Sequence, residues 1–137
     1  HNLNNHPIKI CKEYIYKYFK SLSENDSYEQ FILLDQLDPI VTIDENFDKL
    51  LIKSDHPSRS KSDTYYVSDN LVLRTHTSAH QHSLLTKGHN NFLVTGDVYR
   101  KDEVNSTHYY AFHQMEGLSK VPDGEDPCVA LNKSYLV

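Results

Sequence analysis

The chain has 137 residues, with 14 Lys and Arg against 19 Asp and Glu, which gives a formal net charge of −5 at pH 7. This length suits one domain and is short for two. The acidic balance argues against a free-standing nucleic-acid binder, which would carry a basic face, so most phosphate contacts of any RNA partner are expected elsewhere. No stretch approaches the roughly 20 consecutive apolar residues of a membrane span. Cys11 and Cys128 are far apart and lack C-x-x-C spacing, and we expect both to be reduced thiols in the core.

The first half of the chain predicts one helix followed by short strands. Pro7 is favoured at the first position of a helix, and apolar residues then recur at helical spacing as far as Lys20. The predicted buried stripe of this helix is Ile8, Cys11, Ile15, Tyr18 and Phe19. The segments that follow are a polar loop at 21–30, strands at 31–34 and 39–43, a helical turn at 46–52 and an irregular polar stretch at 55–63.

The second half predicts two hairpins and one helix. Segments 65–67 and 71–74 are expected to pair as a hairpin, and 92–100 and 109–117 as longer strands. Between them, Ser78 followed by Gln81 is typical of a capping box at the start of a helix that ends at Gly88. Gly96 inside the strand 92–100 indicates a bulge or a close backbone approach. A helix followed by mostly antiparallel strands is an α+β arrangement.

Chemically useful side chains gather on one face of the strand 109–117. Strand alternation places five side chains together there: His108, Tyr110, Phe112, Gln114 and Glu116. An amide, a carboxylate and aromatic rings on one face suit a concave site for a small ligand that carries an ammonium and a ring. The alternative is an edge strand whose polar face lies in water.

Two further segments offer groups that bind anions or polar ligands. Arg100 ends the strand 92–100, where a guanidinium could grip phosphate or carboxylate, although an ordinary surface arginine fits the same position. The junction Arg74–Gln81 leads from a strand into a helix, and free N–H groups at a helix start favour anions. His76, Ser78 and Gln81 would add neutral donors there. The alternative is a capping box that only stabilises the helix end.

These segments match one known pattern in order and spacing. LRTHTSAHQ, FLVTGDVYRKDE and STHYYAFHQMEG closely resemble the motif 2 region of phenylalanyl-tRNA synthetases, and PIVTIDENFDKLLI and DHPSRSKSDTYYV resemble the single-chain mitochondrial form. The resemblance runs from His6 to about Leu118. It implies a class II aminoacyl-tRNA synthetase fold, an antiparallel sheet flanked by helices, with residues 1–137 as a partial catalytic domain. Within it, 6–43 would be the motif 1-like helix and strands, and 71–117 the active-site helix and motif 2 hairpin. The third, Gly-rich ATP motif and an anticodon-binding domain are expected beyond Val137.

The resemblance also implies roles for individual residues. Arg100 would be the catalytic residue, holding the α-phosphate of ATP and the carboxylate of the amino acid. His108 and Asp102 would also bind ATP. Asp102 occupies the position beside the adenine where class II enzymes more often have Glu. Gln114 and Glu116 would receive the substrate ammonium. The full set expected to bind substrate is His76, Ser78, Ala79, His80, Gln81, Arg100, Thr107, His108, Tyr109, Gln114, Met115 and Glu116; no residue is expected to bind a metal.

The implied activity is ATP-dependent formation of phenylalanyl-adenylate and transfer of phenylalanine to tRNA(Phe), with Mg²⁺ accompanying ATP. The implied setting is an organelle matrix, most often mitochondrial, and the implied state is a monomer not associated with a membrane. This chain alone is expected to be inactive. Two alternatives remain open: a non-catalytic synthetase-like binding module, and a metal-dependent hydrolase suggested by His76, His80 and His82. The second lacks the Glu of a zinc-protease pattern and an obvious third ligand.

Overall fold

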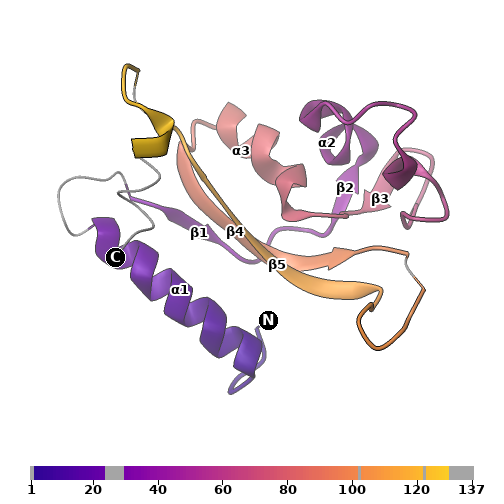
Figure 1. Ribbon diagram of the computed structural model, residues 1–137, viewed down its shortest axis with the longest axis horizontal. Helices are drawn as coiled ribbons and strands as arrows, with labels where there is room; N and C mark the ends of the chain where they lie inside the picture. Colours follow the sequence, from indigo (N-terminus) through magenta and orange to yellow (C-terminus); the bar gives the residue numbers. More distant parts are fainter. Residues whose placement is uncertain (1, 24–29, 102, 122, 130–137) are drawn as a thin grey trace.

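Strand β4, residues Asn91–Tyr99, is the centre of the larger sheet in the computed structural model, which describes residues 2–23, 30–101, 103–121 and 123–129. It pairs in parallel with β1, Ile32–Leu34, and antiparallel with β5, Ala111–Ser119. Most of β4 is buried, because elements cover both faces of the sheet (Figure 1). The predicted α+β class is confirmed, in a mixed sheet. Within the described ranges, no helix combines the length and apolar character that a membrane span needs.

Helix α1, Pro7–Ser23, covers one face of this sheet (Figure 1). Phe19 packs there against Phe31 and Leu93, and Tyr16 donates a hydrogen bond from its hydroxyl to Thr95 Oγ1 at 2.8 Å. The helix continues three residues beyond the predicted end at Lys20. The residues 24–29 of the predicted loop lie outside the described part of the chain.

The buried stripe of α1 differs from the prediction at Cys11 and Lys12. Cys11 is exposed, and so is Cys128, so the expectation of two core thiols is wrong. Lys12 occupies the stripe instead, only 5% exposed, and its Nζ lies 2.5 Å from Asp35 Oδ2. The spacing explains this result, because Lys12 is four residues after Ile8 and seven before Phe19. A long side chain can bury its methylenes on that stripe while its ammonium reaches a carboxylate.

The other face of the sheet carries smaller elements. The 3₁₀ turn η3, Thr77–His80, runs into helix α3, Gln81–Thr86, and Leu84 packs against Phe92 and Val94. Strands β2, Ile40–Thr42, and β3, Leu71–Leu73, form a separate antiparallel pair. The remaining short helical elements are α2, Ile43–Asn46; η1, Asp48–Leu50; and η2, Pro57–Arg59.

The hairpin predicted from 65–67 and 71–74 is reduced to a single bridge between Tyr66 and Val72. β3 makes its ladder with β2, more than 25 residues earlier in the chain, because Val41 and Val72 pack together with Ala79. A capping box does occur in the molecule, but at α2. There Thr42 Oγ1 accepts from the Glu45 N–H, and Glu45 reaches back to the Thr42 N–H.

A buried arginine joins β3 to the central strand. Arg74 is 2% exposed; its Nε donates to the Asp97 carbonyl at 2.8 Å, and its backbone carbonyl accepts from the Tyr99 N–H at 3.0 Å. The guanidinium lies directly over Gly96, where an added Cβ would stand 1.8 Å from Arg74 Nη2. Gly96 thus marks a close approach by this side chain, and not the bulge or close backbone approach that the sequence predicted.

Replacing Gly96 with alanine should lower the free energy of unfolding by about 2–4 kcal/mol, because the methyl group displaces a buried guanidinium from its hydrogen bonds. Urea denaturation of the two proteins measures the difference. In an Arg74→Met background the same Gly96→Ala change should cost less than about 1 kcal/mol. An equal cost in both backgrounds would contradict this account.

Candidate functional site

A group of polar contacts joins β5 to η3 and the start of α3. Glu116 Oε2 accepts hydrogen bonds from Thr77 Oγ1 at 3.1 Å and Ser78 Oγ at 2.5 Å, and Glu116 Oε1 accepts from Gln81 Nε2. Gln114, two residues earlier on the same face of β5, accepts at Oε1 from the Thr77 N–H at 3.1 Å. We call these five residues, Thr77, Ser78, Gln81, Gln114 and Glu116, the acceptor cluster.

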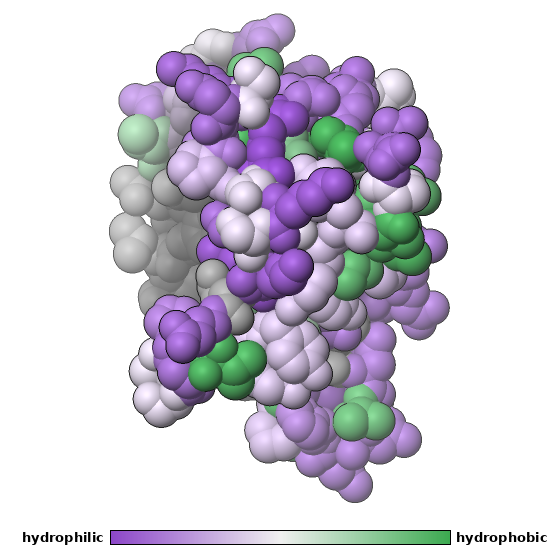
Figure 2. Space-filling view, turned by 90° about the vertical axis from the view of Figure 1, so that its right-hand side faces the viewer, coloured by the Kyte–Doolittle hydropathy of each residue, from purple (hydrophilic) through white to green (hydrophobic). Residues whose placement is uncertain are grey.

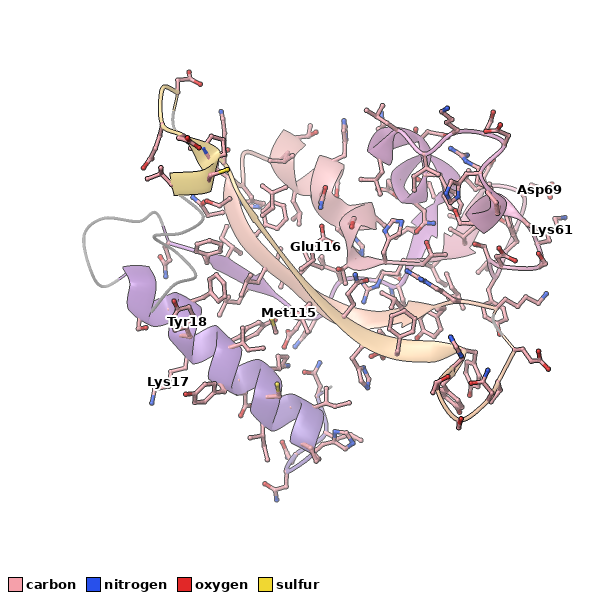
Figure 3. All side chains as sticks on the ribbon, in the orientation of Figure 1. Lys17, Tyr18, Lys61, Asp69, Met115 and Glu116 are labelled. Carbon is pink, nitrogen blue, oxygen red and sulfur yellow. The ribbon has the colours of Figure 1, made fainter. Side chains whose placement is uncertain are left out.

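Strand alternation separates Met115 from this cluster. Glu116 points toward α3, whereas Met115 points to the opposite face of the sheet, toward α1 (Figure 3). Met115 packs there against the cluster of Phe19, Phe31 and Leu93. The structure therefore brings together Ser78, Gln81, Gln114 and Glu116 of the predicted site but places Met115 elsewhere.

The predicted capping box of Ser78 and Gln81 is wrong. Neither η3 nor α3 has a side-chain hydrogen bond at its N-cap. The Ser78 and Gln81 side chains instead donate hydrogen bonds to the Glu116 carboxylate. Hydrogen bonds to an ionised carboxylate are stronger than those between neutral groups, so they outweigh a local cap. The Thr77 backbone N–H at this junction likewise donates a hydrogen bond to the neutral amide of Gln114.

A pocket of about 330 Å³ lies beside the acceptor cluster, lined by Ile52, His56, Ser58, Asp63, Thr64, Thr75, His76 and Arg100. His76 links the two regions. Its pKa is lowered first by burial; the Glu116 carboxylate opposes this and the Arg100 guanidinium adds to it. His76 therefore lies within electrostatic range of both charged groups. Both of its ring nitrogens are buried, and neither has a hydrogen-bond partner of ordinary geometry among the described residues.

Arg100 is held loosely at the edge of this pocket. It is exposed, its Nε lies 3.4 Å from the Thr75 carbonyl, and its guanidinium lies 5.5 Å from the centre of the Phe112 ring. Phe112 precedes Gln114 by two positions, so the guanidinium and the acceptor cluster share one face of β5. Because the Arg100 side chain makes only this one long hydrogen bond among the described contacts, its guanidinium can still bind an anion. Arg100 and Glu116 thus both lie within electrostatic range of His76, while the role assigned to Arg100 stays a prediction.

Three of the predicted residues, Thr107, His108 and Tyr109, lie in the loop between β4 and β5. Thr107 and His108 form hydrogen bonds with Asn105 Oδ1. The Tyr109 hydroxyl donates a hydrogen bond to the Tyr110 hydroxyl, and this bond raises the pKa of Tyr109. These loop residues are exposed, and none of their described contacts reaches the acceptor cluster. Because β5 begins at Ala111, strand alternation does not extend back to His108 or Tyr110. The predicted adenine contact, Asp102, lies outside the described residues.

The face that includes this loop is mostly polar, with apolar side chains in small separate groups (Figure 2). Such a surface fits a ligand recognised by charge and hydrogen bonds better than one recognised by apolar contact alone.

Comparison with known proteins decides the family. Residues 1–123 match the family described as "tRNA synthetases class II core domain (F)". The chain belongs to this family. The resemblance drawn from the motifs is therefore confirmed.

Individual relatives agree with this class II assignment. The chain is 57% identical over 117 residues to "Phenylalanine--tRNA ligase, chloroplastic/mitochondrial" of Arabidopsis thaliana, covering 85% of this chain and 26% of that protein. It is 49% identical over 119 residues to "Phenylalanine--tRNA ligase, mitochondrial" of Rattus norvegicus, covering 86% and 25%. The chain thus spans about a quarter of the length of these relatives. The fold also matches the crystal structure of pyrrolysyl-tRNA synthetase from Desulfitobacterium hafniense, with a TM-score of 0.55, 20% identity, and coverage of 75% of this chain and 36% of that one.

Two residues of the class II core were given no role from the sequence. Thr77 is completely buried and donates hydrogen bonds to both Gln114 and Glu116 of β5. Arg74, at the start of the junction, donates a hydrogen bond to the Asp97 carbonyl of β4. A signal for Arg74 was present in the segment Leu71–Arg74, where alternation puts it on the same side as the buried Val72. No local signal marks Thr77, since its partners lie 37 and 39 residues away.

Ala79 and His80, predicted near the substrate, face the core and the arginine. Ala79 is 1% exposed and packs on Val41 and Val72. His80 Nε2 lies 2.8 Å from Arg74 Nη1 and must be unprotonated to accept its hydrogen bond. Burial, followed by the Arg74 charge, lowers the pKa of His80 from 6.5 to about 4; Glu45 and Asp38 oppose the shift.

This lowered pKa predicts a specific acid sensitivity. The unfolded chain binds a proton at His80 below about pH 6.5, whereas the folded chain does so only near the lowered value. The free energy of unfolding should therefore fall by about 2–3 kcal/mol between these limits on account of His80. Urea denaturation from about pH 7 down to about pH 4 measures the decline.

His80→Gln should remove this component, because an amide oxygen accepts from Arg74 without titrating. His82→Gln is the matched control, since His82 is exposed and lies in the adjoining helix α3. The explanation fails if the two variants lose stability equally as the pH falls.

Proposed function

We propose that this chain carries part of the catalytic centre of a phenylalanine–tRNA ligase that works in an organelle, mitochondrial or plastid. The relatives named above are phenylalanine–tRNA ligases of those compartments. The observation that carries the proposal is the placement of the acceptor cluster and the Arg100 guanidinium on one face of β5, both within electrostatic range of His76.

The acceptor cluster is suited to an ammonium group. An ionised carboxylate has about four positions for hydrogen-bond donors. Thr77, Ser78 and Gln81 occupy three of them, which leaves Glu116 able to accept from one further donor. The Gln114 oxygen has a second lone pair beyond the one that Thr77 uses. A ligand that supplies N–H donors and positive charge fits this arrangement, and the ammonium of an amino acid supplies both.

Arg100 would serve the other end of the substrate. In the proposed first step, a carboxylate oxygen of phenylalanine attacks the α-phosphorus of ATP, and the bond to pyrophosphate breaks. A guanidinium at the reacting groups offsets the negative charge that develops on the phosphoryl oxygens. In the second step a ribose hydroxyl of the terminal adenosine of tRNA(Phe) attacks the activated carbonyl carbon, and AMP leaves. Neither step needs a protein nucleophile.

Mg²⁺ commonly accompanies ATP in such reactions. No group of three or more His, Cys, Asp or Glu side chains is arranged to hold a metal ion within the ranges that the structure describes.

Arg100→Ala should slow ATP–pyrophosphate exchange in the full-length protein by about two to three orders of magnitude, because a charge-assisted contact to the reacting phosphate is lost. Isotope exchange with phenylalanine as substrate measures the effect. Lys101→Ala is the neighbouring control and should leave exchange within about twofold, since its Nζ contacts the Lys61 carbonyl and the Tyr65 ring rather than the pocket. Near-normal exchange in Arg100→Ala would refute the role, and no exchange in the unaltered protein would favour a non-catalytic binding module.

Glu116→Gln should raise the KM for phenylalanine in the same assay by about tenfold or more while changing the KM for ATP little. The substitution keeps the shape of the side chain but removes the charge that attracts the ammonium. An unchanged KM for phenylalanine would count against the ammonium site itself.

A further inference from the structure

Thr77 is the one residue of the acceptor cluster that contacts both acceptors of β5. It begins η3, and its relative exposure is 0%. Its N–H donates to Gln114 Oε1 and its Oγ1 donates to Glu116 Oε2, both at 3.1 Å. Gln114 and Glu116 project from alternate positions of one strand, so a single buried side chain bridges them.

The first of these bonds fixes the orientation of the Gln114 amide. A backbone N–H can only donate, so the amide oxygen, and not the NH₂ group, faces Thr77. The oxygen keeps one lone pair for a second donor. Rotating the amide would place an NH₂ group against the N–H of Thr77, where neither could be satisfied.

The second bond fixes Glu116. Ser78 and Gln81 also donate to this carboxylate, but both are only partly buried. The Thr77 side chain is fully enclosed and branched at Cβ, which restricts it to few rotamers. Thr77 is therefore the stiffest of the three donors. A carboxylate held in advance loses less freedom when a ligand binds.

We propose that Thr77 is a positioning residue that holds Gln114 and Glu116 in place as paired acceptors for the ammonium of the amino acid substrate. This inference rests on the proposed function and extends it. Thr77 touches no substrate atom; it acts through the two acceptors. Its loss should therefore weaken recognition of the ammonium and spare recognition of ATP.

The test compares Thr77→Val with Thr77→Ser in the full-length protein. Valine keeps the volume, the branching and the backbone N–H but removes the hydroxyl, whereas serine keeps the hydroxyl and removes the methyl group. In ATP–pyrophosphate exchange, T77V should raise the KM for phenylalanine about tenfold, the usual effect of losing a hydrogen bond to a charged group. The KM for ATP should stay within about twofold, and T77S should restore the KM for phenylalanine to near its original value.

A ligand without the ammonium separates positioning from general damage. Inhibition by 3-phenylpropanoate, which has the ring and carboxylate of phenylalanine but no amine, should be equally strong in T77V and in the unaltered protein. Equal weakening of phenylalanine, ATP and 3-phenylpropanoate would show a purely structural role and overturn the inference. Should T77V not fold, Thr77→Ala gives the same comparison with a smaller side chain.

Glu116→Gln distinguishes failure of this inference from failure of the proposed function. If Glu116→Gln raises the KM for phenylalanine and T77V does not, the positioning role is wrong and the ammonium site stands. If neither variant changes that KM, the ammonium site and the inference both fail.

Discussion

Arg74 and Thr75 carry the chain from strand β3 into η3, and both side chains are buried. Arg74 donates to the Asp97 carbonyl of β4, while the Thr75 N–H donates to Asn46 Oδ1 and Thr75 Oγ1 accepts from Asn46 Nδ2. A buried guanidinium is costly unless its donors are satisfied, so Arg74 has few alternative positions. These bonds fix where η3 begins relative to the sheet. Every contact of the acceptor cluster depends on that placement.

The positions of Gln114 and Glu116 are set by the register between β4 and β5. Gln114 stands opposite Gly96, and Glu116 stands opposite Val94. Gly96 is the position over which the Arg74 guanidinium lies. The glycine therefore makes room for the arginine on the same face that carries the two acceptors. Tertiary packing and the site are built by one set of residues, so a change at Gly96 should disturb both.

The sequence predicted the periodic elements and missed the long-range polar contacts. The α1 helix, strands β4 and β5, and the common face of Gln114 and Glu116 follow from spacing alone. Ser78 and Gln81 were assigned to a cap because the pattern describes only neighbours in the chain. Glu116, 38 and 35 residues away, competes for the same donors with a full charge. Lys12 was missed for a related reason, since its partner Asp35 comes from another segment.

The site carries one negative and one positive group on the same face of β5. Glu116 provides the negative end, and Arg100 the positive end. Burial lowers the pKa of His76, so this nearby imidazole is neutral near pH 7 and adds no charge that would offset Glu116. An amino acid is a zwitterion with the complementary order, an ammonium beside a carboxylate. Two opposite charges at separate positions favour one orientation of such a ligand over its reverse, because the reversed ligand would meet like charges at both ends.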